Sequence, residues 1–154
     1  MMKISGFLAF IVMLAAGILT LTACREAASP LEDVNWVMTS YSEGGEPVNA
    51  LPGTDVTVLF DSRDKTVKGS GGCNAYSGNY TLDGMNLSFT ELFMTLMACQ
   101  DAAVMAQEHT YIDIFKDADS FEVKQGKLII YSGQKTITFK RVDTGTKTIS
   151  QRGE

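Results

Sequence analysis

Three cysteines and one histidine are the residues of this 154-residue sequence whose side chains most readily support covalent or metal chemistry. A nucleophilic cysteine needs a histidine base beside its thiol. His109 follows Cys99 by ten residues and falls on the solvent side of a predicted helix, which disfavours a cysteine hydrolase. The cysteines and the histidine also lack the CxxC and HxxxH spacings that supply a tetrahedral metal site. We therefore expect no catalytic residue, no cofactor and no metal.

The glycine-rich stretch 68–74 (KGSGGCN) has the glycine density of a phosphate-binding loop. It lacks the closing Gly-Lys-Ser/Thr of such loops, and no helical pattern follows it. Closely spaced glycines between two strands more often mark a bulge or a tight bend. We interpret this stretch as structural.

The first two dozen residues predict how the chain reaches its compartment. One lysine is followed by a long uncharged apolar run, which is typical of a secretory signal. The run ends in Leu21-Thr22-Ala23-Cys24, which resembles the bacterial lipobox, where cleavage precedes a lipidated cysteine. The resemblance implies a signal peptide over residues 1–23 and a lipidated tether over residues 24–30, with Cys24 carrying the lipid. An uncleaved N-terminal anchor with an incidental cysteine is the alternative.

The residue after Cys24, the length and the net charge of the chain indicate which compartment and which classes of partner to expect. Arg25 follows Cys24 where some sorting signals have an aspartate, and by resemblance this favours the outer membrane, with the domain facing the periplasm. Removal of residues 1–23 takes away one positive charge, so the net charge changes from −5 to −6 and 131 residues remain. That length suits one domain. The acidic balance argues against nucleic acid as a partner, because phosphate binding needs clustered Lys and Arg.

Two cysteines, Cys73 and Cys99, remain once Cys24 carries lipid. In an oxidising compartment such an even pair most simply forms a disulfide. The chain-entropy model gives a loop of this length a stabilisation of about 3.5 kcal/mol. Two buried free thiols are the alternative, because the sequence does not give the separation of the two Cα atoms.

Short alternating segments separated by turn residues predict strands over most of the remaining chain. The predicted strands span residues 34–42, 56–60, 66–69, 76–82, 86–89, 121–124, 128–131 and 136–140, with a loop over 43–52. Residues 101–117 lack Gly and Pro, begin with the good N-cap residue Asp101, and predict an amphipathic helix. Residues 143–154 predict a flexible tail. The expected fold class is mainly β (α+β): a curved antiparallel sheet or half-open barrel of about seven to nine short strands, with the helix packed across it.

Glu108 is the one charged residue in the apolar stripe of the predicted helix. At 3.6 residues per turn that stripe contains Val104, Met105, Glu108, Tyr111, Ile112 and Phe115, whereas Gln107 and His109 lie off it. The carboxylate either reaches water at the edge of the stripe, or is buried and accepts hydrogen bonds from a loop, because an unpaired buried charge is not tolerated. We favour a structural partner over catalysis, since the sequence places no second carboxylate or histidine beside it.

Several of these residues together resemble the META domain family, which includes a bacterial heat-shock protein. The resemblance covers residues 31–142. It rests on a tryptophan, a GxxGCN loop, a TxMAC segment, a helical glutamate and a final phenylalanine, namely Trp36, Gly69, Gly72, Cys73, Asn74, Gly78, Thr95, Met97, Cys99, Glu108 and Phe139. It implies a compact antiparallel β fold with one helix, in exported and often lipidated proteins linked to stress tolerance and envelope maintenance. No enzymatic activity, cofactor or catalytic residue comes with it.

The expected function is that of a non-enzymatic exported lipoprotein of the bacterial envelope. It would be anchored in the membrane through Cys24 and act by contact with an envelope protein in stress tolerance or envelope maintenance. One alternative is a module that binds an apolar ligand such as an acyl chain beside Leu92, Phe93, Met94, Leu96 and Met97, although core packing explains these residues equally well. Another is an inhibitor of a basic exogenous hydrolase such as lysozyme, which an acidic domain would suit.

Overall fold

The computed structural model describes residues 29–142. The predicted signal peptide, Cys24 and the predicted tail over 143–154 lie outside these residues. The described part contains β1 (Asn35–Ser42), β2 (Val48–Asn49), β3 (Val56–Asp61), β4 (Thr66–Gly71), β5 (Ala75–Asp83), β6 (Asn86–Met94), α2 (Ala102–Lys116), β7 (Ser120–Lys124), β8 (Lys127–Ser132) and β9 (Lys135–Val142). Within residues 29–142, no helix has the length and apolarity needed to cross a bilayer.

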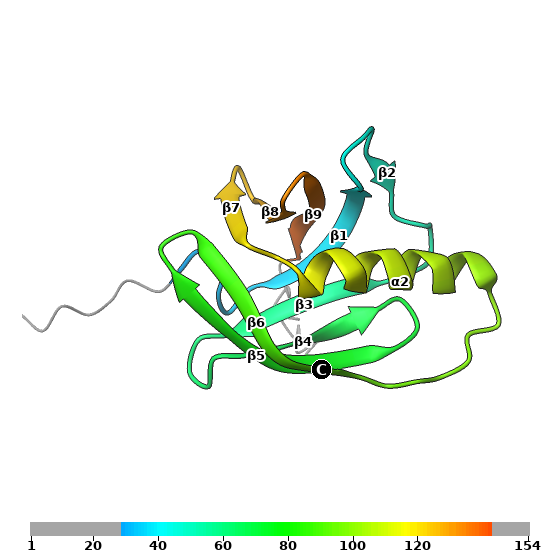
Figure 1. The fold of residues 1–154 in the computed structure, drawn as a ribbon, viewed down its shortest axis with the longest axis horizontal. Helices are drawn as coiled ribbons and strands as arrows, with labels where there is room; N and C mark the ends of the chain where they lie inside the picture. Colours follow the sequence, from blue (N-terminus) through cyan, green and yellow to red (C-terminus); the bar gives the residue numbers. More distant parts are fainter. Residues whose placement is uncertain (1–28, 143–154) are drawn as a thin grey trace, which may run out of the picture.

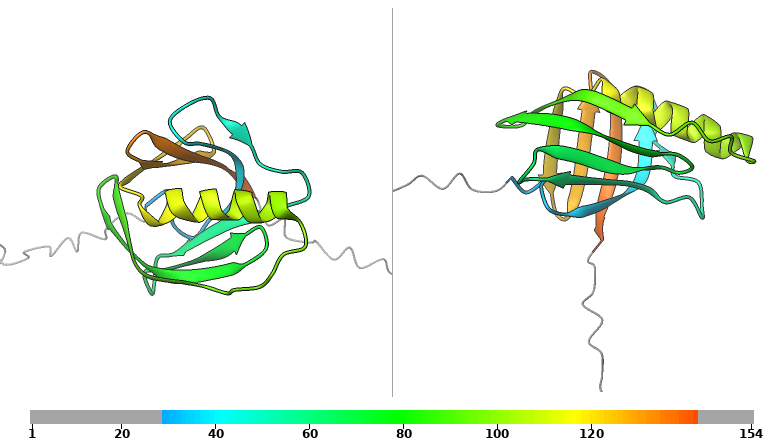
Figure 2. Two further views of the ribbon diagram at one scale, coloured as in Figure 1. Left: turned by 45° about the vertical axis from the view of Figure 1, so that its right-hand side comes forward. Right: turned by 90° about the horizontal axis from the view of Figure 1, so that it is seen from below.

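The strands form one antiparallel sheet that curves into a ring (Figures 1 and 2). The strand order is β2-β1-β3-β4-β5-β6-β7-β8-β9, and β1 also pairs with β9, which closes the ring and leaves β2 attached outside it. Strands β6 and β7 pair only at Asn86 and Ser120, which is the shortest strand pairing in the ring. Helix α2, which links these two strands along the chain, packs across the ring. The predicted fold class is therefore confirmed, with β2 added inside the stretch predicted as a loop.

The core lies inside the ring and beneath the helix. Alternation within the strands sends one set of side chains inward, as in β3, where Val56, Val58 and Phe60 are buried. Aromatic rings fill the space where the helix meets the sheet. Phe115 of α2 stacks on Phe89 with 4.3 Å between ring centroids and also contacts Phe60. Such offset aromatic contacts add to the free energy from burial of apolar area.

Helix α2 begins where the sequence predicts. Asp101 is the N-cap, and its side chain accepts a hydrogen bond of 2.8 Å from the backbone N–H of Ala103. The buried face differs from the predicted stripe, since it comprises Gln107, Glu108, Tyr111, Ile114 and Phe115. Met105, expected on that face, is 46% exposed.

The position of the helix explains this difference. Its first turn lies beyond the strands of the ring (Figure 2, right), and Ala102, Ala103 and Met105 of that turn are exposed, whereas Gln107 and Glu108 in the next turn are buried. Gln107 instead meets the chain between β2 and β3. Its Oε1 accepts a hydrogen bond from the backbone N–H of Leu51 at 2.7 Å, and its Nε2 donates one to the Oγ1 of Thr54 at 3.0 Å. Gln107 is buried because these bonds satisfy its polar atoms.

Candidate functional site

The site is built around the buried carboxylate of Glu108, which points from α2 at the turn between β4 and β5. Only 5% of this residue is exposed. Its Oε2 accepts hydrogen bonds from the backbone N–H groups of Cys73, at 3.0 Å, and Asn74, at 2.6 Å. Its Oε1 accepts one from the side-chain amide of Asn74 at 2.6 Å. Of the two interpretations open from the sequence, the structure has the buried carboxylate that accepts hydrogen bonds from a loop.

Asn74 connects this carboxylate to the segment that follows β6. While its amide nitrogen donates to Glu108, its Oδ1 accepts hydrogen bonds from the Thr95 hydroxyl at 2.9 Å and the Met97 backbone N–H at 2.7 Å. The Thr95 hydroxyl in turn accepts a hydrogen bond from the backbone N–H of Ala75 at 3.2 Å. One buried asparagine therefore positions both the helix and the start of the segment 95–101.

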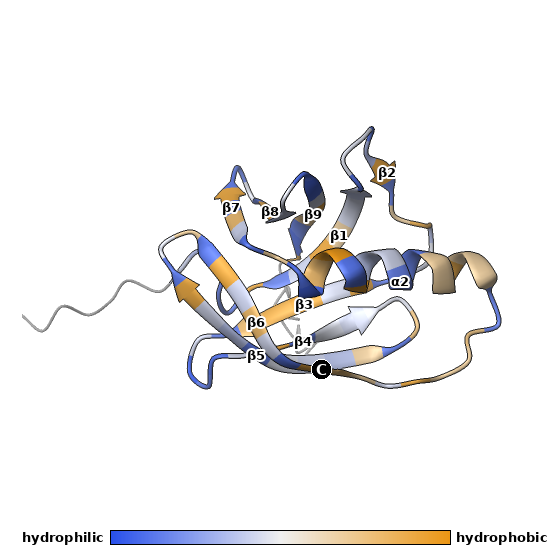
Figure 3. Ribbon diagram, in the orientation of Figure 1, coloured by the Kyte–Doolittle hydropathy of each residue, from blue (hydrophilic) through white to orange (hydrophobic). Residues whose placement is uncertain are grey.

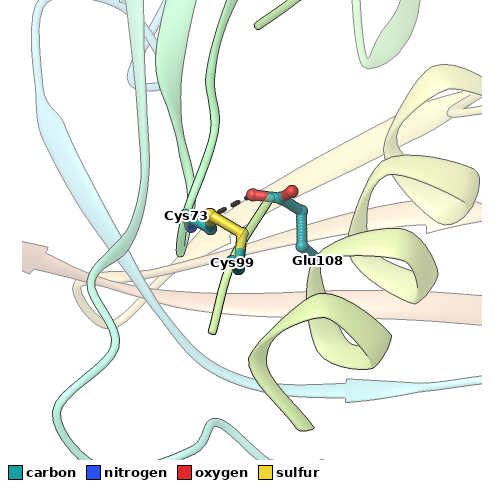
Figure 4. Close-up of side chains that lie close together, drawn as sticks. All are labelled: Cys73, Cys99 and Glu108. Carbon is teal, nitrogen blue, oxygen red and sulfur yellow. Dashed lines mark hydrogen bonds between the residues drawn. A yellow bond between two sulfur atoms is a disulfide. The ribbon is translucent and has the colours of Figure 1, made fainter. Parts of the chain in front are cut away.

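Cys73 and Cys99 hold the far end of the same segment. Their Cα atoms are 6.2 Å apart, and the structure joins their sulfur atoms in a disulfide (Figure 4). Cys73 also donates its backbone N–H to Glu108, as the dashed line in Figure 4 marks. The segment 95–101 is thus fastened at Thr95 and Met97 by hydrogen bonds and at Cys99 by a covalent bond. We call it the held loop.

The glycines of the turn allow these groups to approach. A Cβ atom at Gly71 would lie 2.7 Å from the Cγ and an oxygen of Glu108, and one at Gly69 would collide with the carbonyl oxygen of Thr57. Gly72 has φ of +113°, a conformation that side chains rarely adopt. The turn leads into the strand β5, whereas a phosphate-binding loop leads into a helix, and none of its residues 72–74 is a lysine that could bind a phosphate. These contacts agree with a structural role for the glycine-rich stretch.

The remaining family residues lie away from this cluster. Trp36 is buried in the core, where its Nε1 donates a hydrogen bond to the carbonyl of Leu31 at 2.9 Å, and Phe139 is buried in the same core. His109 lies on the outer side of α2, 81% exposed, with its Nδ1 3.3 Å from a carboxylate oxygen of Asp113. The structure therefore brings Gly72, Cys73, Asn74, Thr95, Met97, Cys99 and Glu108 together, and separates Trp36, Phe139 and His109 from them.

Four large apolar residues in or next to the held loop are exposed. Leu96 is 91% exposed, Phe93 68%, Met97 57% and Met105 46%. We call these four residues the apolar loop surface. Figure 3 shows hydrophobic colouring along much of the loop and over the start of α2, with hydrophilic colouring between them. The sequence offered core packing as one explanation of the apolar residues in 92–97. Only Leu92 and Met94 pack against the core. The alternation of β6 turns Phe93 outward, and a hydrogen bond to Asn74 fixes the backbone of Met97.

A second polar cluster lies at the other end of the ring. The Glu32 carboxylate accepts hydrogen bonds from the Tyr80 hydroxyl and, at 2.6 Å, from the Lys65 ammonium. Burial alone raises the pKa of Glu32, but these hydrogen bonds outweigh it and hold the pKa below its ordinary value. A groove of about 910 Å³ lies here, lined in part by Glu32, Lys65, Met85 and Phe121. This hollow is not beside Leu92 to Met97, where the sequence suggested an apolar ligand.

The sequence did not place Glu108 beside the cysteines. The three residues come from the β4–β5 turn, the held loop and the second turn of α2, and one ligand atom of each lies within 4.8 Å of the others. In residues 29–142 this is the only group of three or more potential Cys, His or carboxylate metal ligands. The one available signal was the polar residue in an apolar helical stripe, which predicts a buried partner without identifying it.

Comparisons with known proteins agree with this fold. A family model described as META domain matches residues 29–144, and no curated protein matches the chain. An NMR structure of a protein from Burkholderia xenovorans has 27% sequence identity and a TM-score of 0.63, covering 73% of this chain and 83% of its own. A second NMR structure has 24% identity and a TM-score of 0.55, covering 71% and 90%.

A crystal structure of a DUF4847 family protein from Bacteroides vulgatus is also similar. It has 12% identity and a TM-score of 0.53, and the match covers 72% of this chain and 94% of that one. At this identity, as for the second NMR structure, the likeness shows the fold alone.

Proposed function

The chain belongs to the META domain family, and we propose that it is a non-enzymatic lipoprotein of the bacterial envelope that binds another protein through the apolar loop surface. Lipid on Cys24 would anchor it in the outer membrane, with the domain facing the periplasm. Stress tolerance or envelope maintenance is the process in which we place this contact, on the family resemblance. The held loop is the single observation that carries the proposal.

The polar groups of the site support binding over catalysis. Each hydrogen-bonding atom of Asn74 and Glu108 is engaged with the backbone or with the other side chain, and the two sulfur atoms are bonded to each other. Nucleophilic catalysis needs a free nucleophile within reach of a base. His109 is exposed on the other side of the helix and does not meet this requirement. These groups hold the loop in place.

Leu96 and Met97 of the apolar loop surface belong to the held loop, and Phe93 and Met105 precede and follow it in the chain. Large apolar side chains gathered on the surface of a soluble domain mark interaction sites, because water-exposed apolar area is unfavourable. A loop already fastened in one conformation loses little conformational entropy when it binds. Leu96 is the most exposed of these residues and is flanked by the fastened residues Thr95 and Met97. It is the central contact in our proposal.

The direction of the tether fits a protein partner. The first described residue, Ser29, lines the same groove as Gly84 and Met85 of the β5–β6 turn. This turn lies at the opposite end of the domain from the start of α2 (Figure 1). Residues 25–28 would span about 17 Å at most between Cys24 and Ser29. A domain tethered at that end would direct the apolar loop surface away from its own membrane and toward proteins in the aqueous space.

Site-specific photocrosslinking of the full chain in the bacterium that produces it tests this function. We expect a photoreactive residue at position 96 to give a discrete crosslinked protein, and Met97→Asp to abolish that product. The matched control carries the photoreactive residue at Asp64, which is exposed in the β3–β4 turn at the tether end. The same products from both positions, or none from position 96, would show that the apolar loop surface binds no partner.

A further inference from the structure

The disulfide and Glu108 bring two sulfur atoms and a carboxylate oxygen to one point. These three atoms lie within 4.8 Å of one another. Cys73 and Cys99 are half-buried, and Glu108 is buried. Sulfur and carboxylate oxygen are both ligands of zinc in proteins. While the disulfide is intact, its sulfur atoms are bonded to each other and offer no thiolate to a metal.

Reduction of the disulfide would convert Cys73 and Cys99 into free thiols beside the Glu108 carboxylate. A dithiol reductant supplies two electrons and two protons, so that Cys73 and Cys99 become thiols while the reductant is oxidised to its own disulfide. The two thiols then lie beside a carboxylate that makes no ion pair with any described Lys, Arg or His. Loss of both thiol protons would place three negative groups together, and their repulsion would favour a bound cation.

We propose that the reduced pair Cys73 and Cys99 and the carboxylate of Glu108 bind one thiophilic divalent cation of the Zn²⁺ class. Binding would release the two thiol protons to water and form two metal–sulfur bonds and one metal–oxygen bond. This inference departs from the expectation drawn from the spacing of Cys and His alone, because the third ligand is a glutamate that only the fold brings to the cysteines.

The distances suit a tetrahedral site. Zinc–sulfur bonds of about 2.3 Å and zinc–oxygen bonds of about 2.0–2.2 Å separate neighbouring ligand atoms by about 3.5–3.8 Å. The two sulfur atoms and the carboxylate oxygen already lie within 4.8 Å of one another. After reduction, side-chain rotations that separate the two sulfur atoms are sufficient to reach these spacings. Because both cysteines are half-buried, a water molecule can supply the fourth ligand.

The surroundings of Glu108 fit a ligand of this kind. Carboxylates that ligate metals are themselves hydrogen-bonded by neighbouring groups, which orient them. The Asn74 amide and the backbone N–H groups of Cys73 and Asn74 hold the Glu108 carboxylate from the side of the β4–β5 turn. Its Oε1 accepts one of these hydrogen bonds and its Oε2 accepts two.

Metal titration of the full chain in detergent tests the proposal. The chain is reduced, freed of reductant without air, and titrated with Zn²⁺ against a chromophoric chelator, with Cd²⁺ used in parallel for its thiolate charge-transfer absorption. We expect one Zn²⁺ per reduced chain, none per oxidised chain, and at least about tenfold weaker binding by reduced Glu108→Gln. Reduced Glu46→Gln, which alters an exposed loop residue, is the matched control and binds as the unaltered chain does.

Circular dichroism reports whether the reduced chain and its variants are folded, so that a loss of Zn²⁺ binding can be told apart from unfolding. A reduced chain that unfolds is expected to refold on addition of Zn²⁺, since metal binding and folding are then linked. The proposal is overturned by a folded reduced chain that binds no Zn²⁺ and by an unfolded one that Zn²⁺ does not restore. It is equally overturned when the oxidised chain binds as tightly as the reduced chain, or when Glu108→Gln binds as tightly as Glu46→Gln.

Discussion

Asn74 and Glu108 are joined by two hydrogen bonds of 2.6 Å, one from the backbone and one from the side chain of the asparagine to the two carboxylate oxygens. This pair connects the helix to the β4–β5 turn. The side-chain Oδ1 of Asn74 accepts hydrogen bonds from Thr95 and Met97 and so connects the helix and the turn to the held loop. Two residues 34 positions apart in the chain therefore set the position of the surface through which we propose that the protein acts.

Replacement of Glu108 by alanine is expected to destabilise the domain by about 3 kcal/mol. Three N–H donors lose a charged acceptor, and the donors left buried and unpaired carry the larger part of the cost. Equilibrium urea unfolding measures this change. Glu46→Ala, at an exposed loop position, should alter the unfolding free energy by less than about 0.5 kcal/mol. A loss below about 1 kcal/mol for Glu108→Ala would contradict the structural role that we assign to the carboxylate.

Leu92 in β6 and Leu96 in the held loop should respond differently to replacement by alanine. Leu92 packs against the core, so Leu92→Ala is expected to cost about 2 kcal/mol of unfolding free energy. Leu96 is 91% exposed, so Leu96→Ala should leave stability within about 0.5 kcal/mol while it weakens the crosslinked product. Thermal unfolding of both variants in parallel makes the comparison. Equal destabilisation would mean that Leu96 is covered in the folded protein.

Acid should weaken the fold in part through Glu32. Its folded-state pKa lies below the ordinary value of 4.5, so its contribution to stability is complete above that pH and is lost as the pH falls through the folded-state pKa. We expect unfolding free energy measured from about pH 5 to about pH 3 to decline less steeply for Glu32→Gln than for the unaltered chain. Glu46→Gln should follow the unaltered chain. Parallel declines for all three would show that Lys65 and Tyr80 do not lower the pKa of Glu32.

The lipid anchor that we propose at Cys24 predicts a specific mass for the protein isolated from membranes. The chain should begin at residue 24 and carry acyl chains on Cys24, because a lipobox directs cleavage before the lipidated cysteine. Intact mass spectrometry makes this measurement. Cys24→Ser should retain residues 1–23 without lipid. An unaltered chain that keeps residues 1–23 would favour the uncleaved N-terminal anchor instead.

The disulfide predicts a pattern of thiol labelling. Neither Cys73 nor Cys99 should react with an alkylating reagent in the denatured, non-reduced protein, and both should react after reduction. Cys99→Ser should expose one reactive thiol and cost about 3.5 kcal/mol of stability in the chain-entropy model. Labelling of both cysteines without reductant would instead support the two free thiols that the sequence left open.

Local patterns were sufficient for most elements of this fold, but they missed β2 and the second half of β6, which was predicted to end at Phe89 and runs to Met94. Alternating apolar residues predicted the strands, and Asp101 predicted the start of the helix, because strand alternation and N-capping depend on residues that are neighbours in the chain. The paired GCN and TxMAC segments were sufficient for the family. The lipid on Cys24 stays a prediction, since that residue lies outside the described part of the chain.

What the sequence by itself determined is thus the class of the fold, the limits of most of its elements and the presence of a polar residue, Glu108, that must find a buried partner. Only the tertiary structure decided that this partner is the Cys73–Asn74 turn, that Gln107 is buried in place of Met105, and that Leu96 faces solvent. The physical reason is that burial depends on which distant segments cover a face. Only the first turn of the helix lies beyond the strands of the ring, and no periodicity within residues 101–117 carries that information.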